Sequence, residues 1–575
     1  MTTVPPTTLD NSATLTEDVQ RSVSKWMLAW NWVEARLIAL AEQANPILVK
    51  ETRQALKSRQ FTITFMVVLL FCWIVSFVGI AIVGPQIYFA AAGPGMLMAY
   101  YTILIVPLTL VVPFTAFRSL ASEQEENTFD LLSITTLSSR QIITGKLASS
   151  LLQMVVYLSA VSPCIAFTFL LRGVDALTVA VLLSIAVLAS IGLSMVSLLI
   201  GASVKVRSTQ VIVSVALVLI LAGACVALWF IGFGIISAGT SSSRGSGIGL
   251  MILAMLAAYI TTFGLLHSAA AAQIAFVSEN RSTPLRRWML AQQACICAFV
   301  GGVAYTALAD FGPVGSELFS AIAILLAGFG APYWYFMGSL MTGEWPHLSR
   351  RVQRSLPSSD AWRPFVSLMN PGPGSGYLFA VANMSMLISI GLLGVLLYWW
   401  LNGLQGWGGG RAGGPSAEVA IYFVILAWSY MVAFLGVGRL IVIALRRWAY
   451  VPMTAAFLIH IVLFLAAIGV PTVIQMTSRE LRNSGYTLLQ MTNPVWTLSD
   501  LAEKGVSQVQ GEVLILILPM AAIIALLLNM RSVATELLLQ KTPVPVRIIE
   551  DEAQMEAAIP RAPSSPWDAE EPSGS

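Results

Sequence analysis

Charged residues are scarce in this sequence: Asp, Glu, Lys and Arg make up 11% of its 575 residues, whereas hydrophobic residues make up 57%. A soluble domain carries roughly 25% charged residues. The mean hydropathy of +0.78 is also far above that of a soluble chain. The composition therefore excludes a soluble globular protein and indicates one that is mostly surrounded by lipid.

Cysteine is also rare, and its placement excludes two common structural devices. All five cysteines fall within apolar runs: Cys72, Cys164, Cys225, Cys295 and Cys297. This placement disfavours a disulfide framework or a zinc site, and side-chain packing explains the Cys-x-Cys pair at Cys295. We expect no metal site and no catalytic residues.

A nucleotide-binding signature is absent as well. Gly145-Lys146 is followed by Leu147, and the residue five positions before Gly145 is Arg140, so the P-loop spacing fails. We expect no cofactor and no nucleic-acid partner. The protein is not predicted to be an enzyme, and any ATP hydrolysis is expected in a separate subunit.

What the sequence has in abundance is apolar runs of about 20 residues, the length that crosses a hydrocarbon core of about 30 Å as a helix. About twelve such runs occur, near residues 61–83, 96–117, 147–171, 176–203, 209–236, 248–275, 288–308, 318–342, 377–401, 419–445, 451–476 and 512–530. The predicted fold is an all-α, polytopic integral membrane protein. Its first six spans occupy 61–275 and the second six occupy 276–530.

Segments outside the spans define the remaining organisation. Residues 1–20 predict a disordered tail, and 21–60 predict amphipathic interfacial and elbow helices, with no signal peptide before them. An outer segment at 477–511 is expected to form one or two short helices. Residues 531–575 predict a disordered tail.

Basic residues lie in the connections on one side, which fits the positive-inside rule with both termini in the cytosol. They are Lys205, Arg207, Arg281, Arg286, Arg287, Arg350, Arg351, Arg354, Arg446, Arg447 and Arg531. The predicted location is a cell membrane, most simply the bacterial cytoplasmic membrane.

Within the spans, ionisable residues are few. Arg439 lies about two turns from the end of its span and is expected to snorkel to the interface. His267 and His460 are read as hydrogen-bonded packing residues. This scarcity argues against an ion-coupled carrier, which keeps carboxylates in the bilayer. The first outer loop, Gly84 to Gly95, contains no acidic residue, which argues against a lipid-linked glycosyltransferase.

The connection at 118–147 is the most informative loop. Ser122 and Glu125 form one capping box and Ser138 and Gln141 form a second, so the loop predicts two short helices with a break at Thr135-Thr136. The second helix is expected to run through Gly145-Lys146 into the third span. The residues of this loop fit two interpretations equally well: a solvated connection between spans, or an element on which a partner protein docks.

This run resembles the cytosolic loop of type-2 ATP-binding-cassette (ABC) permeases, over roughly residues 45–275. The matching elements are Glu123 to Glu126, Thr128, Asp130, Leu131-Leu132, Ser139-Arg140 and Gly145-Lys146, together with Asn45-Pro46 and Lys50-Glu51 before the first span. Asn127 and Thr136 depart from the usual Gly and Pro.

The resemblance implies a permease subunit, most simply an exporter, driven by a separate ABC ATPase subunit. The implied ATPase-coupling residues are Glu123, Glu126, Thr128, Asp130, Leu131, Leu132, Arg140, Gly145 and Lys146. Of these, Arg140 and Lys146 would anchor the loop. A membrane scaffold or assembly factor with a permease-like fold is the alternative, and an ion-coupled carrier is a third class.

The second six spans show no sequence echo of the first. A homodimer and an internal pseudo-dimer are both compatible with the sequence; in the latter, the connection from Glu344 to Tyr377 would match the coupling loop, although it is basic. The walls of a substrate cavity are expected to consist of Leu, Val, Ala, Ser and Thr. These residue types do not identify the transported substrate.

Overall fold

The structure is a computed structural model that describes residues 46–84, 91–125, 137–204, 206–238, 247–276, 279–311, 316–346, 348, 353, 363–402, 416–539, 547, 550–551 and 553–555. These residues form helices and no strand. Twelve of the helices are long and apolar enough to cross a membrane, one for each predicted span. The prediction of an all-α, multi-pass membrane protein is confirmed. The predicted segments at 1–20 and 21–45 lie outside the described residues.

The chain divides into two compact units. Unit 1 comprises Met1–Ala275 with Ala294–Phe299, and unit 2 comprises Phe276–Gln293 with Val300–Ser575. The main boundary falls between the sixth and seventh spans.

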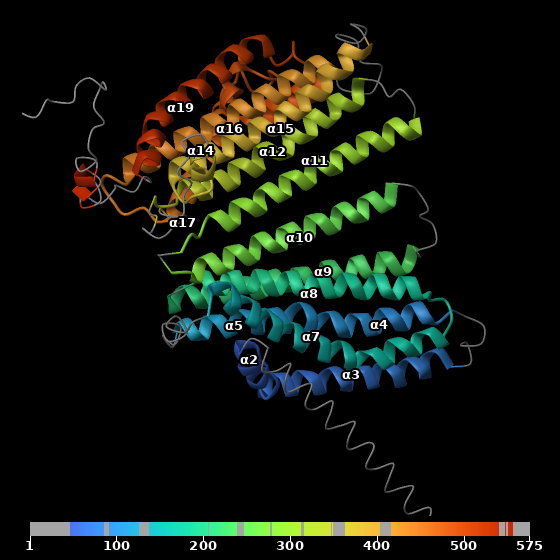
Figure 1. Cartoon of the computed structure of the whole chain (residues 1–575). Coiled ribbons are helices and arrows are strands. Elements are labelled where there is room, and N and C mark those ends of the chain that lie inside the picture. The colour runs from blue at the N-terminus through green and yellow to red at the C-terminus, as the bar shows by residue number, and fades with distance from the viewer. Residues whose placement is uncertain are drawn as a thin grey trace, which may run out of the picture. The chain divides into compact units, whose positions relative to one another are not determined.

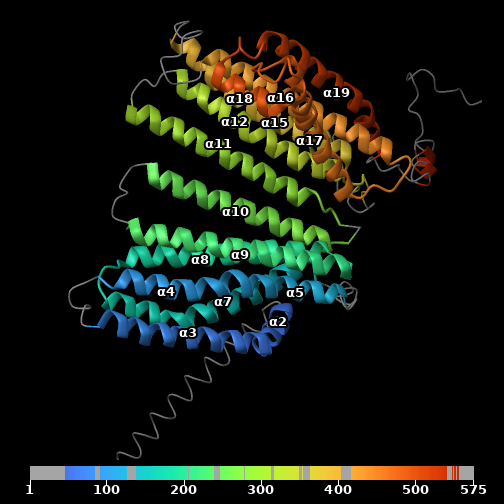
Figure 2. The ribbon, with the colours of Figure 1, turned by 180° about the vertical axis from the view of Figure 1, so that it is seen from behind.

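Unit 1 contains one short helix and six spans, coloured blue to green in Figure 1. The helices are α2 (Pro46–Leu56), α3 (Arg59–Val83), α4 (Gly93–Val106), the π-helix η2 (Pro107–Val111), α5 (Val112–Glu125), α7 (Ser139–Leu170), α8 (Ala176–Ser203), α9 (Arg207–Ala238) and α10 (Gly247–Ile274). Helix α2 packs on α7 and lies near the start of α3 (Figures 1 and 2). We call the end of unit 1 where α5 stops and α7 starts its charged end.

The second span is longer than predicted. Helices α4, η2 and α5 form one continuous span, Gly93–Glu125, so the predicted end at residue 117 and the predicted helix start at Ser122 are both wrong. The first capping box therefore lies in the last turn of a helix, where no free N–H group needs a cap. Residues 126–136 of the predicted loop lie outside the described part of the chain.

The second capping box is confirmed. The Ser138 hydroxyl accepts from the N–H of Gln141, and the Gln141 side chain accepts from the N–H of Ser138. From this cap, α7 runs without a break through Gly145-Lys146 and across the membrane. Satisfying two terminal N–H groups explains why the helix begins here.

Aromatic hydroxyl groups are bonded within the core of unit 1. Tyr100 and Ser76 share a hydrogen bond of 2.8 Å, and Tyr157 and Thr64 share one of 2.5 Å. Both tyrosines are fully buried in the cluster that joins α3, α4 and α7. Each hydroxyl thus gains a partner where water is absent.

Unit 2 contains the other six spans and three short helices, coloured green to red in Figure 1. The helices are α11 (Thr283–Phe311, apart from the residues assigned to unit 1), α12 (Ser316–Thr342), α14 (Arg363–Ser367), α15 (Pro373–Asn402), α16 (Ala417–Leu445), α17 (Met453–Thr477), the 3-10 helix η4 (Leu488–Thr492), α18 (Pro494–Lys504) and α19 (Gly511–Leu539). Helices η4 and α18 are the short helices predicted for 477–511. We call the end where α12 stops and α15 starts the charged end of unit 2.

The last span was predicted too short. Helix α19 continues to Leu539, so the predicted end at 530 and a disordered tail from 531 are wrong over residues 531–539. Beyond Leu539, the short described stretches at 547, 550–551 and 553–555 are also helical. The bonds of Glu536 described below explain why the helix continues past the apolar run.

The order of helix contacts repeats between the units. In unit 1 the second span (α4 to α5) packs against the third, fourth and fifth (α7, α8 and α9), and α10 packs against α7 and α8. In unit 2 the second span (α12) likewise packs against α15, α16 and α17, and α19 packs against α15 and α16. The second to sixth spans of the two halves thus share an order and a pairing of helices that their sequences do not reveal. The first spans differ: α3 packs against α4 and α7, whereas α11 has no comparable packing among the described residues.

Candidate functional site

The charged end of unit 1 is organised around one lysine. Lys146 Nζ lies 2.9 Å from Glu51 Oε1 of α2, 2.9 Å from Glu123 Oε2 of α5, and 3.0 Å from the Ser119 carbonyl oxygen of α5. Because α7 is continuous from its cap at Ser138, Lys146 is held two turns inside a rigid helix. We call Lys146, Glu51, Glu123 and Ser119 the Lys146 cluster.

The Lys146 cluster is shielded from solvent. The Lys146 side chain is 0% exposed, and the side chains of Glu51 and Glu123 are 11% and 12% exposed. The ammonium group donates hydrogen bonds to Glu51 Oε1 and to the Ser119 carbonyl, and it forms an ion pair with Glu123 Oε2. One cation thus neutralises part of the charge of two carboxylates and joins three helices.

The end of α5 is also tied to α8 and α9. The Gln124 amide donates to the Ala202 carbonyl of α8 at 3.2 Å, and the Gln210 amide of α9 donates to the Ala121 carbonyl at 2.8 Å. Near them, Arg207 and Glu125 form an ion pair of 2.9 Å. The last turn of α5 is therefore fixed to its neighbours before the chain enters the predicted coupling loop.

The predicted coupling residues fall into two groups. Glu126, Thr128, Asp130, Leu131 and Leu132 lie outside the described residues, so their roles stay predictions. The others lie at the charged end of unit 1: Glu123, Arg140, Gly145 and Lys146.

The four residues of the second group differ in solvent exposure. Arg140 is exposed in the first turn of α7, whereas Gly145, Lys146 and Glu123 are buried. Lys146 contacts α2 and α5, and its expected role as an anchor of the coupling loop stays a prediction. The expected contact of Glu123 with an ATPase stays a prediction, and in the structure its carboxylate binds Lys146.

Sequence reasoning missed Glu51 as a site residue. The available signal was Lys146 itself, since a lysine that enters a span needs a carboxylate or carbonyl partner. Glu51 stands in the Lys50-Glu51 pair that already matched the permease pattern. Its distance of 95 residues from Lys146 hid the pairing.

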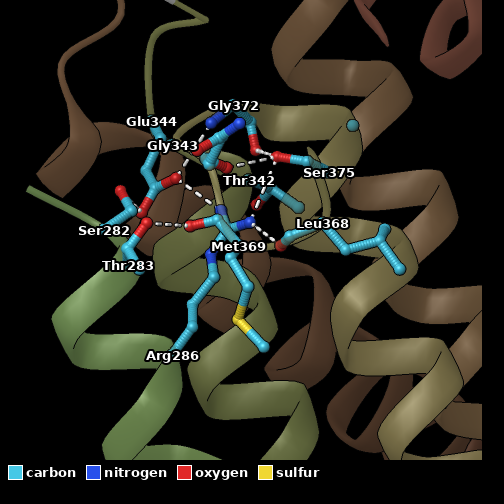
Figure 3. Close-up of polar contacts among 12 residues, drawn as sticks. Ser282, Thr283, Arg286, Thr342, Gly343, Glu344, Leu368, Met369, Gly372 and Ser375 are labelled. Atoms are coloured by element: carbon cyan, nitrogen blue, oxygen red, sulfur yellow. Dashed lines mark hydrogen bonds and ion pairs between the residues drawn. The ribbon is translucent and has the colours of Figure 1, made fainter. Parts of the chain in front are cut away.

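The charged end of unit 2 carries a comparable arrangement (Figure 3). Arg286 of α11 is fully buried, and its Nη2 lies 2.7 Å from Glu344 Oε2, just beyond the end of α12. Its Nη1 donates to the Ser375 hydroxyl at 3.2 Å and to the Leu368 carbonyl. Glu344 also accepts from the Ser282 hydroxyl at 2.8 Å. Figure 3 shows these groups converging from α11, α12 and the start of α15.

A second buried ion pair adjoins the start of α15. The Gly374 N–H donates to Glu536 Oε2 of α19 at 2.8 Å, and Arg439 Nη2 of α16 lies 3.6 Å from the same oxygen. Arg439 Nη1 donates to Asn529 Oδ1 at 2.7 Å. A helix N-terminus favours a carboxylate there.

This pair corrects two predictions. The Arg439 side chain is 1% exposed and points to α19, so it does not snorkel to the interface. Glu536 was assigned to the tail, but it lies inside the last span, Gly511–Leu537. The burial of both side chains explains the difference, because each is the partner of the other in a site without water.

Arg446, the residue that follows α16, also lies at the charged end of unit 2. Its Nη2 donates to the Gly343 carbonyl at 2.7 Å, and its guanidinium lies 4.6 Å from the centre of the Trp345 ring. Burial lowers the pKa of Arg446 from its ordinary value, while Glu536 acts in the opposite direction. The group stays a cation at neutral pH because arginine starts from so high a value.

The two histidines have the packing roles that were predicted. His460 is fully buried, with Nδ1 2.8 Å from the Ala456 carbonyl. His267 Nε2 shares a hydrogen bond of 3.0 Å with the Thr144 hydroxyl. In the described part of the chain, no group of three or more His, Cys, Asp or Glu residues could hold a metal ion.

In both units a carboxylate at or just beyond the end of the second span meets a fully buried cation, Lys146 or Arg286. Separating the partners of a buried ion pair is costly, so each cluster holds its helix ends together. A displacement of one helix end can therefore be transmitted to its neighbours. They contain no nucleophile and base arranged for catalysis. Comparison with protein-family models, curated proteins and solved structures finds no match to this chain.

Proposed function

We propose that the protein is the membrane-spanning permease subunit of an ABC transporter, most simply an exporter in a bacterial cytoplasmic membrane. A separate ATPase subunit would bind the segment between α5 and α7. The observation that carries this proposal is the Lys146 cluster, which ties the elbow helix α2 and the end of α5 to the start of α7. These are the three elements in which the sequence resembles type-2 ABC permeases.

The contacts of α5 provide a route for force. A partner that displaced the segment after Glu125 would pull on a helix end bonded to α7, α8 and α9. Since the second span is one continuous helix from Gly93 to Glu125, such a pull would reach the opposite end of unit 1. A solvated connection would need none of these buried ties.

The proposal divides the expected coupling residues into two groups. Glu123 and Lys146 bind each other, so the proposal assigns them to positioning the coupling segment. The contact itself is assigned to residues beyond Glu125, chiefly Glu126 and Asp130. Arg140, exposed in the first turn of α7, is free to lie at the edge of that contact.

The repeated helix pairing favours a chain that supplies both permease units. Because α12, α15, α16 and α17 pair as the second to fifth spans of unit 1 do, the connection between α12 and α15 corresponds to the coupling segment. One copy of the chain would then serve two ATPase subunits. An internal pseudo-dimer is thus preferred over a homodimer.

The test is charge reversal in the coupling segment. In detergent-purified protein, Glu126→Arg with Asp130→Arg should lower both the co-purifying ABC ATPase and its vanadate-sensitive ATP hydrolysis about tenfold or more, as loss of two charge contacts would. The matched control is Glu550→Arg with Asp551→Arg near the C-terminus, which should keep both.

Unchanged ATPase association in the coupling-segment variant would contradict the proposal. Membrane insertion and melting temperature should equal those of the control. If no ABC ATPase accompanies the unmodified chain, the membrane scaffold becomes the better reading.

An ion-coupled carrier is the second candidate, and Glu536 is the observation in its favour. A carboxylate buried in the last span beside Arg439 is the kind of group that such carriers use. Its bonds to Gly374 and Arg439 argue for a structural tie instead. Uptake driven by a proton or sodium gradient without ATP would support the carrier.

A further inference from the structure

Unit 2 contains a large apolar cavity that the charged clusters do not involve. Its volume is about 620 Å³, within the size range of sites for small organic ligands. The walls come from α12, α16 and α17, and α18 supplies the fourth side. Its walls are rich in Phe and Tyr, in contrast to the Leu, Val, Ala, Ser and Thr expected from the sequence.

Three polar groups on the α12 and α16 walls are already bonded to the protein. The Tyr335 hydroxyl donates to the His460 carbonyl at 2.8 Å, and the Tyr430 hydroxyl donates to the Met491 carbonyl at 2.7 Å. The Ser339 hydroxyl donates to the carbonyl of Phe336, one turn earlier in α12. A ligand therefore meets no free donor at these positions, and a polar group entering there would lose its hydration without compensation.

The cavity is elongated along the helices. Its α12 wall extends from Ile324 to Ser339, which is about 22 Å at the rise of an α-helix. A hydrocarbon core is about 30 Å thick. A molecule that fills this space would lie parallel to the helices over most of the bilayer.

Aromatic contacts hold the walls in place. Phe336 and Phe457 pack edge to face with centroids 5.2 Å apart, and Tyr335 and Phe464 lie 5.6 Å apart. Large rings in mutual contact give a wall of fixed shape. The cavity is thus suited to a long, narrow, apolar occupant.

Helix α18 marks the polar end of the cavity. Val495, Leu498 and Ala502 share one face and line the space, while Asp500 and Lys504 form an ion pair of 2.8 Å. An amphipathic helix of this kind sits where apolar and polar surroundings meet. A polar head at α18 and an apolar tail between α12 and α17 would match both surroundings.

The cavity also has a lateral opening. Phe336, Leu465 and Val495 line the cavity and are 49%, 60% and 55% exposed, so the cavity is open to its surroundings on this side. A hydrocarbon chain could enter sideways between α12 and α17 without passing through the charged end.

We propose that this cavity binds one hydrocarbon chain of a long-chain amphiphile, with its polar end at α18. Resting on the proposed function, we further propose that this amphiphile is the cargo of the permease. The first statement concerns binding alone and holds or fails without an ATPase.

Binding is tested with a palmitic acid analogue that carries a diazirine in its chain, added to the purified full-length protein in detergent. Light-induced labelling of α12, α16, α17 and α18 peptides should saturate with probe concentration. Labelling of the exposed apolar face of α3 should instead rise in proportion to it. Proportional labelling at both places would mean that only bulk detergent-like contact occurs, and would overturn the proposal.

A matched pair of variants locates the site. A Cβ on Gly328 would meet only the Phe423 ring, at 3.7 Å, so Gly328→Leu projects into the cavity. Gly469 of α17 has no atom within 4 Å of such a Cβ and does not line the cavity. Saturable labelling should fall about tenfold in Gly328→Leu and stay unchanged in Gly469→Leu. Equal labelling of the two variants would contradict the assignment, and the saturation experiment needs no variant.

A second arm separates cargo from resident lipid. In the complex with its ATPase, addition of Mg-ATP should lower the saturable labelling if the chain belongs to a cargo. Labelling unaffected by turnover would overturn the cargo statement and leave a resident lipid. If no ATPase associates, the proposed function fails, while the saturation result still decides whether the cavity binds the chain.

Discussion

Replacing Lys146 by methionine tests whether the Lys146 cluster holds the charged end of unit 1 together. Methionine keeps most of the length and the apolar stem of lysine and removes its charge. The change leaves Glu51 buried without a cation, and it leaves Glu123 with only the exposed Lys50, whose Nζ lies 4.0 Å from Glu123 Oε1. Every other contact of α7 stays available, so the effect reports on the ion cluster.

The magnitude follows from the distances and the burial. One oxygen of each carboxylate, Glu51 Oε1 and Glu123 Oε2, lies 2.9 Å from Lys146 Nζ. At an effective dielectric constant of about 20, that separation gives about 6 kcal/mol of attraction. Desolvation and the repulsion between the two carboxylates offset much of it, and removing one partner from a buried pair costs about 3–5 kcal/mol. For a unit of this size, the melting temperature should fall by roughly 10 °C.

The measurement is thermal unfolding of the purified protein in detergent. Arg207→Met is the matched control: it removes a cation from an ion pair of the same 2.9 Å length in unit 1, but the two side chains, Arg207 and Glu125, are 84% and 40% exposed. Its melting temperature should change little. Adding Glu51→Gln and Glu123→Gln to Lys146→Met should recover most of the loss, because the neutral amides need no cation.

Two results would refute this reasoning. If Lys146→Met melted like Arg207→Met, burial would not be raising the cost of the lost charge. If the triple variant were no more stable than Lys146→Met alone, the loss would stem from packing around the stem of Lys146 instead of from unpaired carboxylates.

Two further variants test unit 2 by the same melting assay. Arg439→Met should cost about 3–5 kcal/mol because it leaves Glu536 buried and unpaired, and Glu536→Gln in the same chain should restore most of it; no recovery would argue against the pair. Gly438→Ala should cost about 1–3 kcal/mol, since its Cβ would lie 2.5 Å from the buried ring of His460. Gly469→Ala has open space and should instead be neutral or stabilising by up to about 1 kcal/mol through helix propensity, so equal effects at the two glycines would contradict the packing argument.

The spans could be predicted from the sequence, but the ends of two of them could not. Apolar length alone placed twelve spans, since lipid requires every backbone group to be bonded within the helix. It failed at Glu125 and at Leu539, where helices continue past the apolar run. There, bonds to other elements stabilise the extra turns: Gln124 binds α8, and Glu536 binds the start of α15.

The sequence predicted several residues of the candidate site, but only some of the contacts between them. The capping box at Ser138 is local, so the sequence located the start of α7 correctly. Lys146 was recognised through its family-like setting, whereas Glu51, its partner 95 residues away, was not. Glu536 was missed because it stands six residues beyond the predicted end of the last span. Pairings between distant residues depend on helix packing, which a hydropathy pattern does not determine.

The two units meet the same physical requirement with different residues. Glu123 ends the second span of unit 1 and binds a lysine from the third span, whereas Glu344 follows the second span of unit 2 and binds an arginine from the first. Where unit 1 has this lysine, unit 2 has a backbone donor: the Gly372 N–H, directly before the third span, donates to Glu344 at 3.0 Å. A buried carboxylate requires a cation or donors, but any neighbouring helix can supply them. The two halves can therefore share a helix pairing without sharing detectable sequence similarity.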